Sequence, residues 1–137
     1  MINDLTNYCY LATAIDDGLD LGKFLVPRLS KNPSPNHLLI VSYMRESSTL
    51  DEDVMFGFSV DYFDESKFIG PRKLYTDGVW IWSTDIIYYV EKYFLKLPSE
   101  FLSEMKKLNW QTTTLSQAQK QALIEKYQND DSINYIV

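Results

Sequence analysis

Cysteine and histidine are almost absent from this chain of 137 residues, which contains one of each, Cys9 and His37. A lone cysteine excludes an internal disulfide and fits a reducing compartment. One cysteine and one histidine also lack the ligand spacing of a zinc site. The serine elbow of hydrolases and the known signatures of cysteine nucleophiles are missing, so the sequence gives His37 little support as a catalytic group.

Glycine-rich loops and long apolar segments are missing too. The five glycines are scattered, and no Walker loop or dinucleotide-binding pattern is present to hold a phosphate. The apolar runs are far shorter than the roughly 20 residues that cross a bilayer. The N-terminus has no basic segment before an apolar one, as a signal peptide would have. We therefore expect one cytoplasmic domain over residues 1–137, with no cofactor, no bound metal, no catalytic residue and no membrane contact.

Basic residues are in the minority, because the chain has 13 Lys and Arg against 19 Asp and Glu, a net charge of −6. Residues 1–66 hold eleven of the acids and four of the bases, whereas residues 67–137 are nearly balanced. Nucleic-acid binding requires clustered Lys and Arg, so this distribution argues against a nucleic-acid partner. An acidic surface attracts basic partners and accelerates their encounter, although it also serves simple solubility.

The Asp77-Gly78 pair is the strongest local structural signal, because both residues tolerate the positive φ that a type I′ hairpin turn requires. It predicts antiparallel strands near 72–76 and 79–82. Side chains alternate between the faces of a strand, so the two tryptophans of the second strand share one face and its aliphatic residues share the other. Both faces are apolar, which indicates a central strand covered on one side by the helix that follows.

Helices are predicted after the hairpin. Ser83 is a suitable N-cap, and the apolar residues behind it recur at helical spacing. Pro98 suits the first turn of the next helix, and Ser116 with Gln119 has the form of a capping box. The predicted helices span about 84–95, 98–108 and 116–128.

The first half of the chain is less regular. Apolar runs predict a buried strand at about 38–43 and another strand at 54–63. Residues 5–29 are ambiguous: their first part suits a strand and their second part a short helix that ends before Pro27. Strands early and helices late indicate an α+β domain, with an antiparallel sheet that contains the hairpin at 72–82 and packs against the C-terminal helices.

Acidic side chains are the main candidate functional groups. Carboxylates can bind a hard cation, but the EF-hand spacing is absent, and a metal nuclease would also need nearby bases to hold phosphates. Solvated loop acids are the simpler interpretation, and pairing with Lys and Arg of a partner is compatible with it. Tyrosine is a frequent interface anchor, and Tyr88 lies off the main apolar face of its helix. The candidate partner-binding residues are Asp16, Asp17, Asp51, Glu52, Asp53, Asp61, Tyr62, Asp64, Glu65 and Tyr88.

Residues 68–105 read FIGPRKLYTDGVWIWSTDIIYYVEKYFLKLPSEFLSEM. A TDG turn, then W-x-W-S, an apolar helix ending in YYVEKY, and LP-x-E-F opening another helix resemble a segment of small bacterial immunity proteins. These proteins accompany polymorphic or contact-dependent growth-inhibition toxins. In that family a proline often follows the second tryptophan, whereas this chain has Ser83 and Thr84. The resemblance covers somewhat over a quarter of the chain and does not extend to residues 1–67.

The resemblance implies a non-enzymatic cytoplasmic inhibitor that binds a cognate toxin domain and blocks its active site or substrate surface. Many such toxins are nucleases with basic clefts, which acidic loops of an inhibitor can occupy. On this hypothesis the W-x-W hairpin and its helix are mainly scaffold, and the acidic first half is the working surface. Two alternatives remain: an adaptor or regulatory binding module, and a small metal-dependent hydrolase that uses the same carboxylates.

Overall fold

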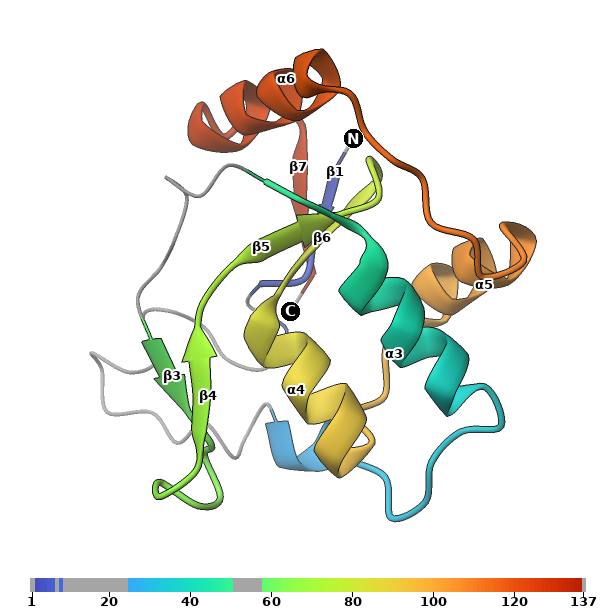
Figure 1. The fold of residues 1–137 in the computed structure, drawn as a ribbon, viewed down its shortest axis with the longest axis vertical. Coiled ribbons are helices and arrows are strands. Elements are labelled where there is room, and N and C mark those ends of the chain that lie inside the picture. Colours follow the sequence, from blue (N-terminus) through green and yellow to red (C-terminus); the bar gives the residue numbers. More distant parts are fainter. Residues whose placement is uncertain (1, 7, 9–24, 51–57, 137) are drawn as a thin grey trace.

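The computed structural model of this chain describes residues 2–6, 8, 25–50 and 58–136 (Figure 1). Five strands form one sheet in the order β2-β5-β6-β1-β7, and β3 and β4 form a separate two-stranded sheet. The strands are β1 (Ile2–Asp4), β2 (Ser48–Thr49), β3 (Phe58–Val60), β4 (Phe68–Pro71), β5 (Leu74–Thr76), β6 (Trp80–Ser83) and β7 (Ile133–Tyr135). The helices are the 3-10 turn η1 (Val26–Arg28), α3 (His37–Glu46), α4 (Thr84–Tyr93), α5 (Ser99–Lys107) and α6 (Gln117–Gln128). The predicted α+β fold class is confirmed.

The β5–β6 hairpin lies where the Asp77-Gly78 pair predicts it, but its turn has a different geometry. Residues 77–79 connect the two strands, and Thr76 pairs with Ile81. The Asp77 carboxylate accepts the backbone N–H of Val79 at 2.9 Å and that of Trp80 at 2.7 Å. Of the two predicted turn residues only Gly78 has a positive φ, 97°. The expected type I′ turn is therefore wrong, because the Asp77 side chain closes the turn in place of a second left-handed residue.

Strand β6 is the middle strand of the larger sheet, and both of its faces are buried. Trp80 and Trp82 face a core formed with α3, α4 and α5, where the ring centre of Phe101 lies 4.8 Å and 5.2 Å from theirs. Ile81 faces a smaller core beneath α6. The prediction of a central strand covered by the following helix is confirmed. Val79 precedes the strand and is exposed, so it does not share the Ile81 face as predicted.

The segment 38–43 belongs to helix α3, so the buried strand predicted there is wrong. Its β-branched residues suggested a strand, but β propensity is a weak preference that packing overrides. The buried residues have the spacing of one helical face, and they are Ile40, Val41, Tyr43 and Met44. Leu38, on the other side, is 80 % exposed. The buried face packs against α4 and α5, which decides the conformation.

The three predicted C-terminal helices are all present. Helix α4 has Ser83 at its N-cap position, although the Ser83 side chain makes no capping hydrogen bond. The hydroxyl of the next residue, Thr84, accepts the backbone N–H of Lys73 at 2.9 Å. At the start of α6, the Ser116 hydroxyl accepts the N–H of Gln119, and the Gln119 side chain accepts the N–H of Ser116. The predicted capping box is confirmed.

The N-terminal strand β1 lies between β6 and β7 and runs parallel to both. The side-chain amide of Asn134 donates to Asn3 Oδ1 at 2.9 Å, joining positions 131 residues apart in the sequence. Turn η1 includes Pro27, whereas the sequence predicted a helix that ends before it. Proline is tolerated in the first turn of a helix, because its missing N–H has no partner there.

The strand predicted at 54–63 is confirmed in part. Strand β3 occupies residues 58–60 and pairs with β4 in an antiparallel hairpin, while residues 54–57 lie outside the described residues. No helix within the described ranges has both the length and the apolar character needed to span a bilayer.

Candidate partner-binding surface

The β3–β4 hairpin stands apart from the five-stranded sheet and packs along α4 (Figure 1). Residues 61–68, with the sequence DYFDESKF, form its turn and the start of β4, and we call them the acidic-aromatic turn. The backbone N–H of Asp61 donates to the carbonyl of Lys67 at 2.9 Å. The N–H of Lys67 in turn donates to the carbonyl of Asp64, also at 2.9 Å. These bonds close the turn upon itself.

The Asp61 carboxylate lies at the centre of this turn and is fully buried. Its Oδ2 accepts the hydroxyls of Tyr88 and Tyr93, each at 2.6 Å. Its Oδ1 accepts the backbone N–H groups of Phe63 at 2.7 Å and Asp64 at 3.2 Å. A buried carboxylate is costly unless its oxygens are hydrogen-bonded. The four donors meet that need and fix the path of the turn around Asp61.

Burial and hydrogen bonding have opposite effects on the pKa of Asp61. Burial is the largest single influence and raises it, but the bonds from Tyr88, Tyr93 and the two backbone N–H groups together bring it below the ordinary value of 3.8. The bond to Asp61, with burial, raises the pKa of Tyr93 to about 12. Burial, with the same carboxylate, raises the pKa of Tyr88 well above its usual range. At neutral pH the cluster is therefore one carboxylate held by two neutral phenols.

Helix α4 provides these hydroxyls because three of its tyrosines lie toward the hairpin. Residues four apart share one side of a helix, and the ring centres of Tyr89 and Tyr93 are 6.0 Å apart. Tyr88 lies 5.5 Å from Tyr89. The Tyr89 hydroxyl accepts the backbone N–H of Tyr62 at 3.1 Å, and the ring of Phe63 lies 4.8 Å from that of Tyr93. Helix α4 thus holds both the backbone and the rings of the turn.

A partly buried ion pair holds the other end of the hairpin. The Arg72 Nε lies 3.1 Å from Asp85 Oδ2 at the start of α4. It also donates to the hydroxyl of Ser59 in β3 at 2.5 Å, and this hydroxyl donates to the same Asp85 oxygen at 3.0 Å. The hairpin is therefore tied to α4 at both ends, which limits the conformational freedom that binding would have to remove.

The outer side of the hairpin exposes apolar groups beside acids. Phe68 is 63 % exposed, and Phe63 and Val60 are exposed as well. Glu65 is exposed at the tip, and Asp64 is half-buried beside it. Neighbouring exposed apolar side chains with a polar rim are typical of protein–protein contact sites. This arrangement makes the acidic-aromatic turn the best candidate for a partner-binding surface in the described part of the chain.

The predicted partner-binding residues fall into three groups. Tyr62, Asp64 and Glu65 lie together on the acidic-aromatic turn. Asp61 and Tyr88 lie there too, but Asp61 is buried instead of being a surface acid, and half-buried Tyr88 directs its hydroxyl to Asp61. Both residues position the turn. The remaining five lie outside the described residues, and they are Asp16, Asp17, Asp51, Glu52 and Asp53.

Sequence reasoning missed several members of this surface. It assigned Tyr93 to the apolar face of α4, although the Tyr93 hydroxyl bonds Asp61. It placed Phe63 in the strand predicted at 54–63 and gave Phe68 no role at this surface, although both are exposed. The alternation of aromatic and acidic residues in DYFDESKF was the available signal, because a buried strand rarely carries three acids within five residues.

Neither a metal site nor a known relative indicates what this surface binds. Among the residues that the structure describes, no three His, Cys, Asp or Glu side chains are placed to hold a metal ion. Comparisons with protein-family models, curated proteins and solved structures find no match to this chain. The resemblance to immunity proteins therefore stays a prediction, and function has to be argued from the acidic-aromatic turn.

Proposed function

We propose that this chain is an immunity protein that binds a cognate toxin domain, a basic nuclease, and blocks its active site or substrate surface. The observation that best supports the proposal is the acidic-aromatic turn, in which a buried carboxylate fixes a turn that exposes acids beside aromatic rings. The resemblance of residues 68–105 to bacterial immunity proteins is compatible with this, because that segment contains β4 and α4, which hold the turn.

The charge of the turn suits a nuclease cleft. A nuclease holds phosphates with Lys and Arg, and the carboxylates of Glu65 and Asp64 can take the place of those phosphates. The net charge of −6 adds a long-range attraction that accelerates encounter with a basic surface. Phe63 and Phe68 supply the apolar contact that charge pairs alone do not provide.

The anchoring of the turn favours tight binding. Ordering a flexible loop on association reduces affinity, whereas a loop already held in its bound shape avoids that loss. The bonds from Tyr88 and Tyr93 to Asp61 hold the turn before any partner arrives. Asp61 is therefore a positioning residue, and the exposed acids and rings around it make the contact.

The direct test is co-expression with the toxin domain encoded immediately upstream of this gene, followed by affinity measurements at two salt concentrations. We expect growth to be restored and a nanomolar complex to form. Its association rate should fall as salt rises, because screening weakens the attraction between exposed charges. A complex that forms but leaves the toxin active would favour an adaptor role instead.

Two matched charge-reversal variants distinguish the contribution of the acidic-aromatic turn to binding from that of the overall electrostatic field. Glu65→Lys and Glu125→Lys make the same change in net charge at exposed positions, and Figure 1 shows α6, which carries Glu125, at the opposite end of the molecule from the β3–β4 hairpin. We expect Glu65→Lys to weaken the complex by about ten-fold and Glu125→Lys by about two-fold or less. Equal effects of the two variants would refute a specific role for the turn.

A further inference from the structure

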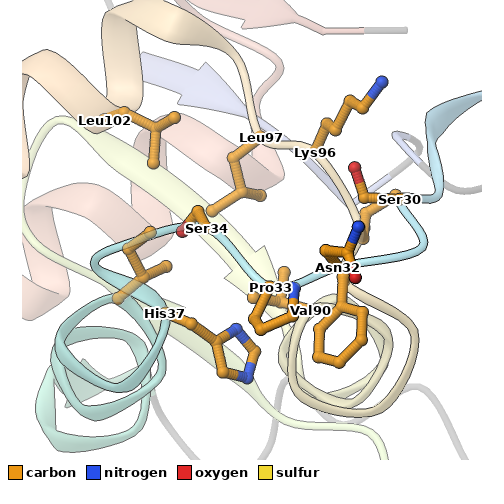
Figure 2. Close-up of a pocket in the computed structure, with 12 residues that line it drawn as sticks. Ser30, Asn32, Pro33, Ser34, His37, Val90, Lys96, Leu97 and Leu102 are labelled. Carbon is orange, nitrogen blue, oxygen red and sulfur yellow. The ribbon is translucent and has the colours of Figure 1, made fainter.

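A second feature lies away from the acidic-aromatic turn, at the start of α3. A pocket of about 320 Å³ opens between the loop before α3 and the segment that joins α4 to α5 (Figure 2). Its polar lining includes Ser30, Asn32, His37 and Lys96, and its apolar lining includes Leu97 and Leu102. Ligand pockets in proteins begin at roughly this size, so the pocket suits a ligand of few atoms.

The walls of the pocket are held by backbone pairing between distant segments. Leu29 and Leu95 form an isolated antiparallel bridge. The N–H of Ser30 donates to the carbonyl of Phe94 at 3.2 Å, and the N–H of Lys96 donates to the carbonyl of Arg28 at 2.8 Å. These bonds fix the two walls relative to each other, so the space between them has a defined shape.

Phe94 forms part of the pocket wall. It is the C-cap of α4 and lies in the left-handed region, with φ at 57°, a conformation that is unfavourable for residues other than glycine. This conformation places its ring in edge-to-face contact with His37, 5.2 Å between ring centres. A left-handed residue is a common helix C-cap, and here it fixes the position of the Phe94 ring in the pocket wall.

The polar side chains that line this pocket are all potential hydrogen-bond donors. They are hydroxyl, amide, imidazole and ammonium groups, and no described lining residue carries a carboxylate. Helix α3 also begins at His37, and a helix N-terminus favours negative charge. The pocket therefore suits an anion.

The lining of the pocket is mixed in Figure 2, where Ser34 lies on the same side as Leu97, and Pro33 and Val90 lie beside Asn32. Within this mixed lining, Ser30, Asn32 and Lys96 gather on one side, and Leu97 and Leu102 lie on the other. The Lys96 side chain extends toward solvent, and its flexible stem can bring the ammonium over the pocket mouth. A ligand that matches both sides carries a negative group at one end and a short apolar body at the other.

We propose that this pocket binds a small monocarboxylate with a branched or short apolar body, its carboxylate toward Ser30, Asn32 and Lys96 and its apolar end against Leu97 and Leu102. A carboxylate fits better than a phosphate, because Lys96 is the one permanent cation among the described lining residues and a more highly charged anion would be repelled by the acidic chain. This inference does not depend on the proposed immunity function.

The test is a titration of the ¹⁵N-labelled protein, followed by NMR. The probes are 4-methylpentanoate, its neutral amide, inorganic phosphate, and N-acetyl-leucine, which carries the carboxylate of a polypeptide end. We expect saturable shifts of the amides in 30–37 and 94–97 with 4-methylpentanoate. The amide should bind about ten-fold more weakly, because it lacks the charge. Binding of phosphate in preference to 4-methylpentanoate would overturn the proposal.

The two carboxylates distinguish the source of the natural ligand. Tighter binding of N-acetyl-leucine than of 4-methylpentanoate would indicate the C-terminal end of a polypeptide, and the reverse order a free small acid. Either order supports a carboxylate site. Absence of saturable binding by both would refute it.

Three variants check that the shifts come from this pocket. Ser34→Trp introduces a bulky group at an exposed lining position without disturbing the core, and it should abolish binding. Lys96→Gln should weaken binding of 4-methylpentanoate about three-fold, as expected for a solvent-exposed charge pair. Lys106→Gln removes the same charge from an exposed position outside the pocket and should leave the affinity unchanged. Unaltered binding in Ser34→Trp would place the ligand elsewhere and overturn the proposal.

Discussion

The two hairpins of this protein both contain aromatic residues, which are buried in β5–β6 and exposed in β3–β4. In β5–β6, Trp80 and Trp82 are buried; Trp80 stacks on Phe101 of α5, and Trp82 packs against the same ring at a tilt. In β3–β4, Phe63 and Phe68 remain exposed, and the turn between the strands is held by hydrogen bonds to a carboxylate. A carboxylate closes both turns, Asp77 in the first and Asp61 in the second. The first hairpin adds apolar burial of its tryptophans, whereas the second depends on the polar cluster around Asp61.

This difference explains how one hairpin can expose aromatic rings without losing its shape. A turn held by its own apolar side chains would have to bury them. Because Tyr88, Tyr93 and two backbone N–H groups hold Asp61 instead, the turn keeps its shape while Phe63 and Phe68 stay exposed. The comparison predicts that mutations will affect stability most in β5–β6 and partner binding most in β3–β4.

The largest expected loss of stability follows removal of a core tryptophan. Trp82→Ala should lower the free energy of unfolding by about 3–5 kcal/mol, because the side chain is fully buried and leaves a cavity. Urea denaturation, with circular dichroism as the probe, measures this. A loss below about 1 kcal/mol would mean that the two hairpins do not differ as described.

The next largest effect belongs to the polar cluster. Asp61→Ala should cost about 2–3 kcal/mol, because it leaves buried donors without their charged acceptor. Tyr93→Phe alone should cost about 1 kcal/mol. In a double-mutant cycle by urea denaturation, the two losses should not add, because both remove the same bond. Additive losses would show that Tyr93 and Asp61 are not coupled.

Two buried acids, Asp61 and Asp4, should make the free energy of unfolding depend on pH with opposite slopes. The pKa of Asp61 is below its ordinary value, so its charged form stabilises the fold above about pH 4, and this contribution is lost as pH falls through the folded pKa. Burial in the larger sheet raises the pKa of Asp4, despite hydrogen bonds from Thr6 and Tyr127. The contribution of Asp4 is therefore present at low pH and is lost as pH rises through its raised pKa.

Unfolding free energies of Asp61→Asn and Asp4→Asn, each compared with the unmodified protein between about pH 3 and pH 7, check this pair. The advantage of the unmodified protein over Asp61→Asn should shrink toward low pH, and its advantage over Asp4→Asn should shrink toward high pH. Profiles with the same slope would contradict the assignment of the two environments.

The smallest effect on stability is expected at the exposed rings. Phe68→Ser should change the free energy of unfolding by about 0.5 kcal/mol or less, since the side chain is 63 % exposed. On the proposed function, the same variant should weaken the toxin complex by about ten-fold or more. Isothermal titration calorimetry and urea denaturation on the same preparation measure both quantities. A variant that loses stability but keeps its affinity would reverse the roles of the two hairpins.

The elements that the sequence predicted well are those with local signals. The Asp77-Gly78 pair located the β5–β6 hairpin, and Ser116 with Gln119 located the start of α6. Segment 38–43 was wrongly predicted as a strand, because its conformation depends on packing against α4 and α5 and on no local cap; the Asn36 side chain makes no capping bond. The placement of β1 depends on pairing with distant segments, which a three-residue sequence cannot specify.

The sequence predicted several residues of the candidate site but not how they are arranged in space. The acids and Tyr62 of the acidic-aromatic turn were found from their clustering. The burial of Asp61 was not, because it depends on two tyrosines 27 and 32 residues away in the sequence. A tyrosine that packs and a tyrosine that holds a carboxylate look the same in sequence, and the fold alone separates them.

The position of β1 between β6 and β7 has a consequence for the order of synthesis. As the chain leaves the ribosome, the β5–β6 hairpin and α4 can form well before residues 133–135 emerge. Until β7 arrives, β1 can at most pair on one side, and its other side presents unpaired N–H and C=O groups that another nascent chain could add to. Strand β7 is therefore the element that covers this side of β1 and becomes the edge of the sheet in its place, so a chain truncated before Ile133 would expose the unpaired groups of β1.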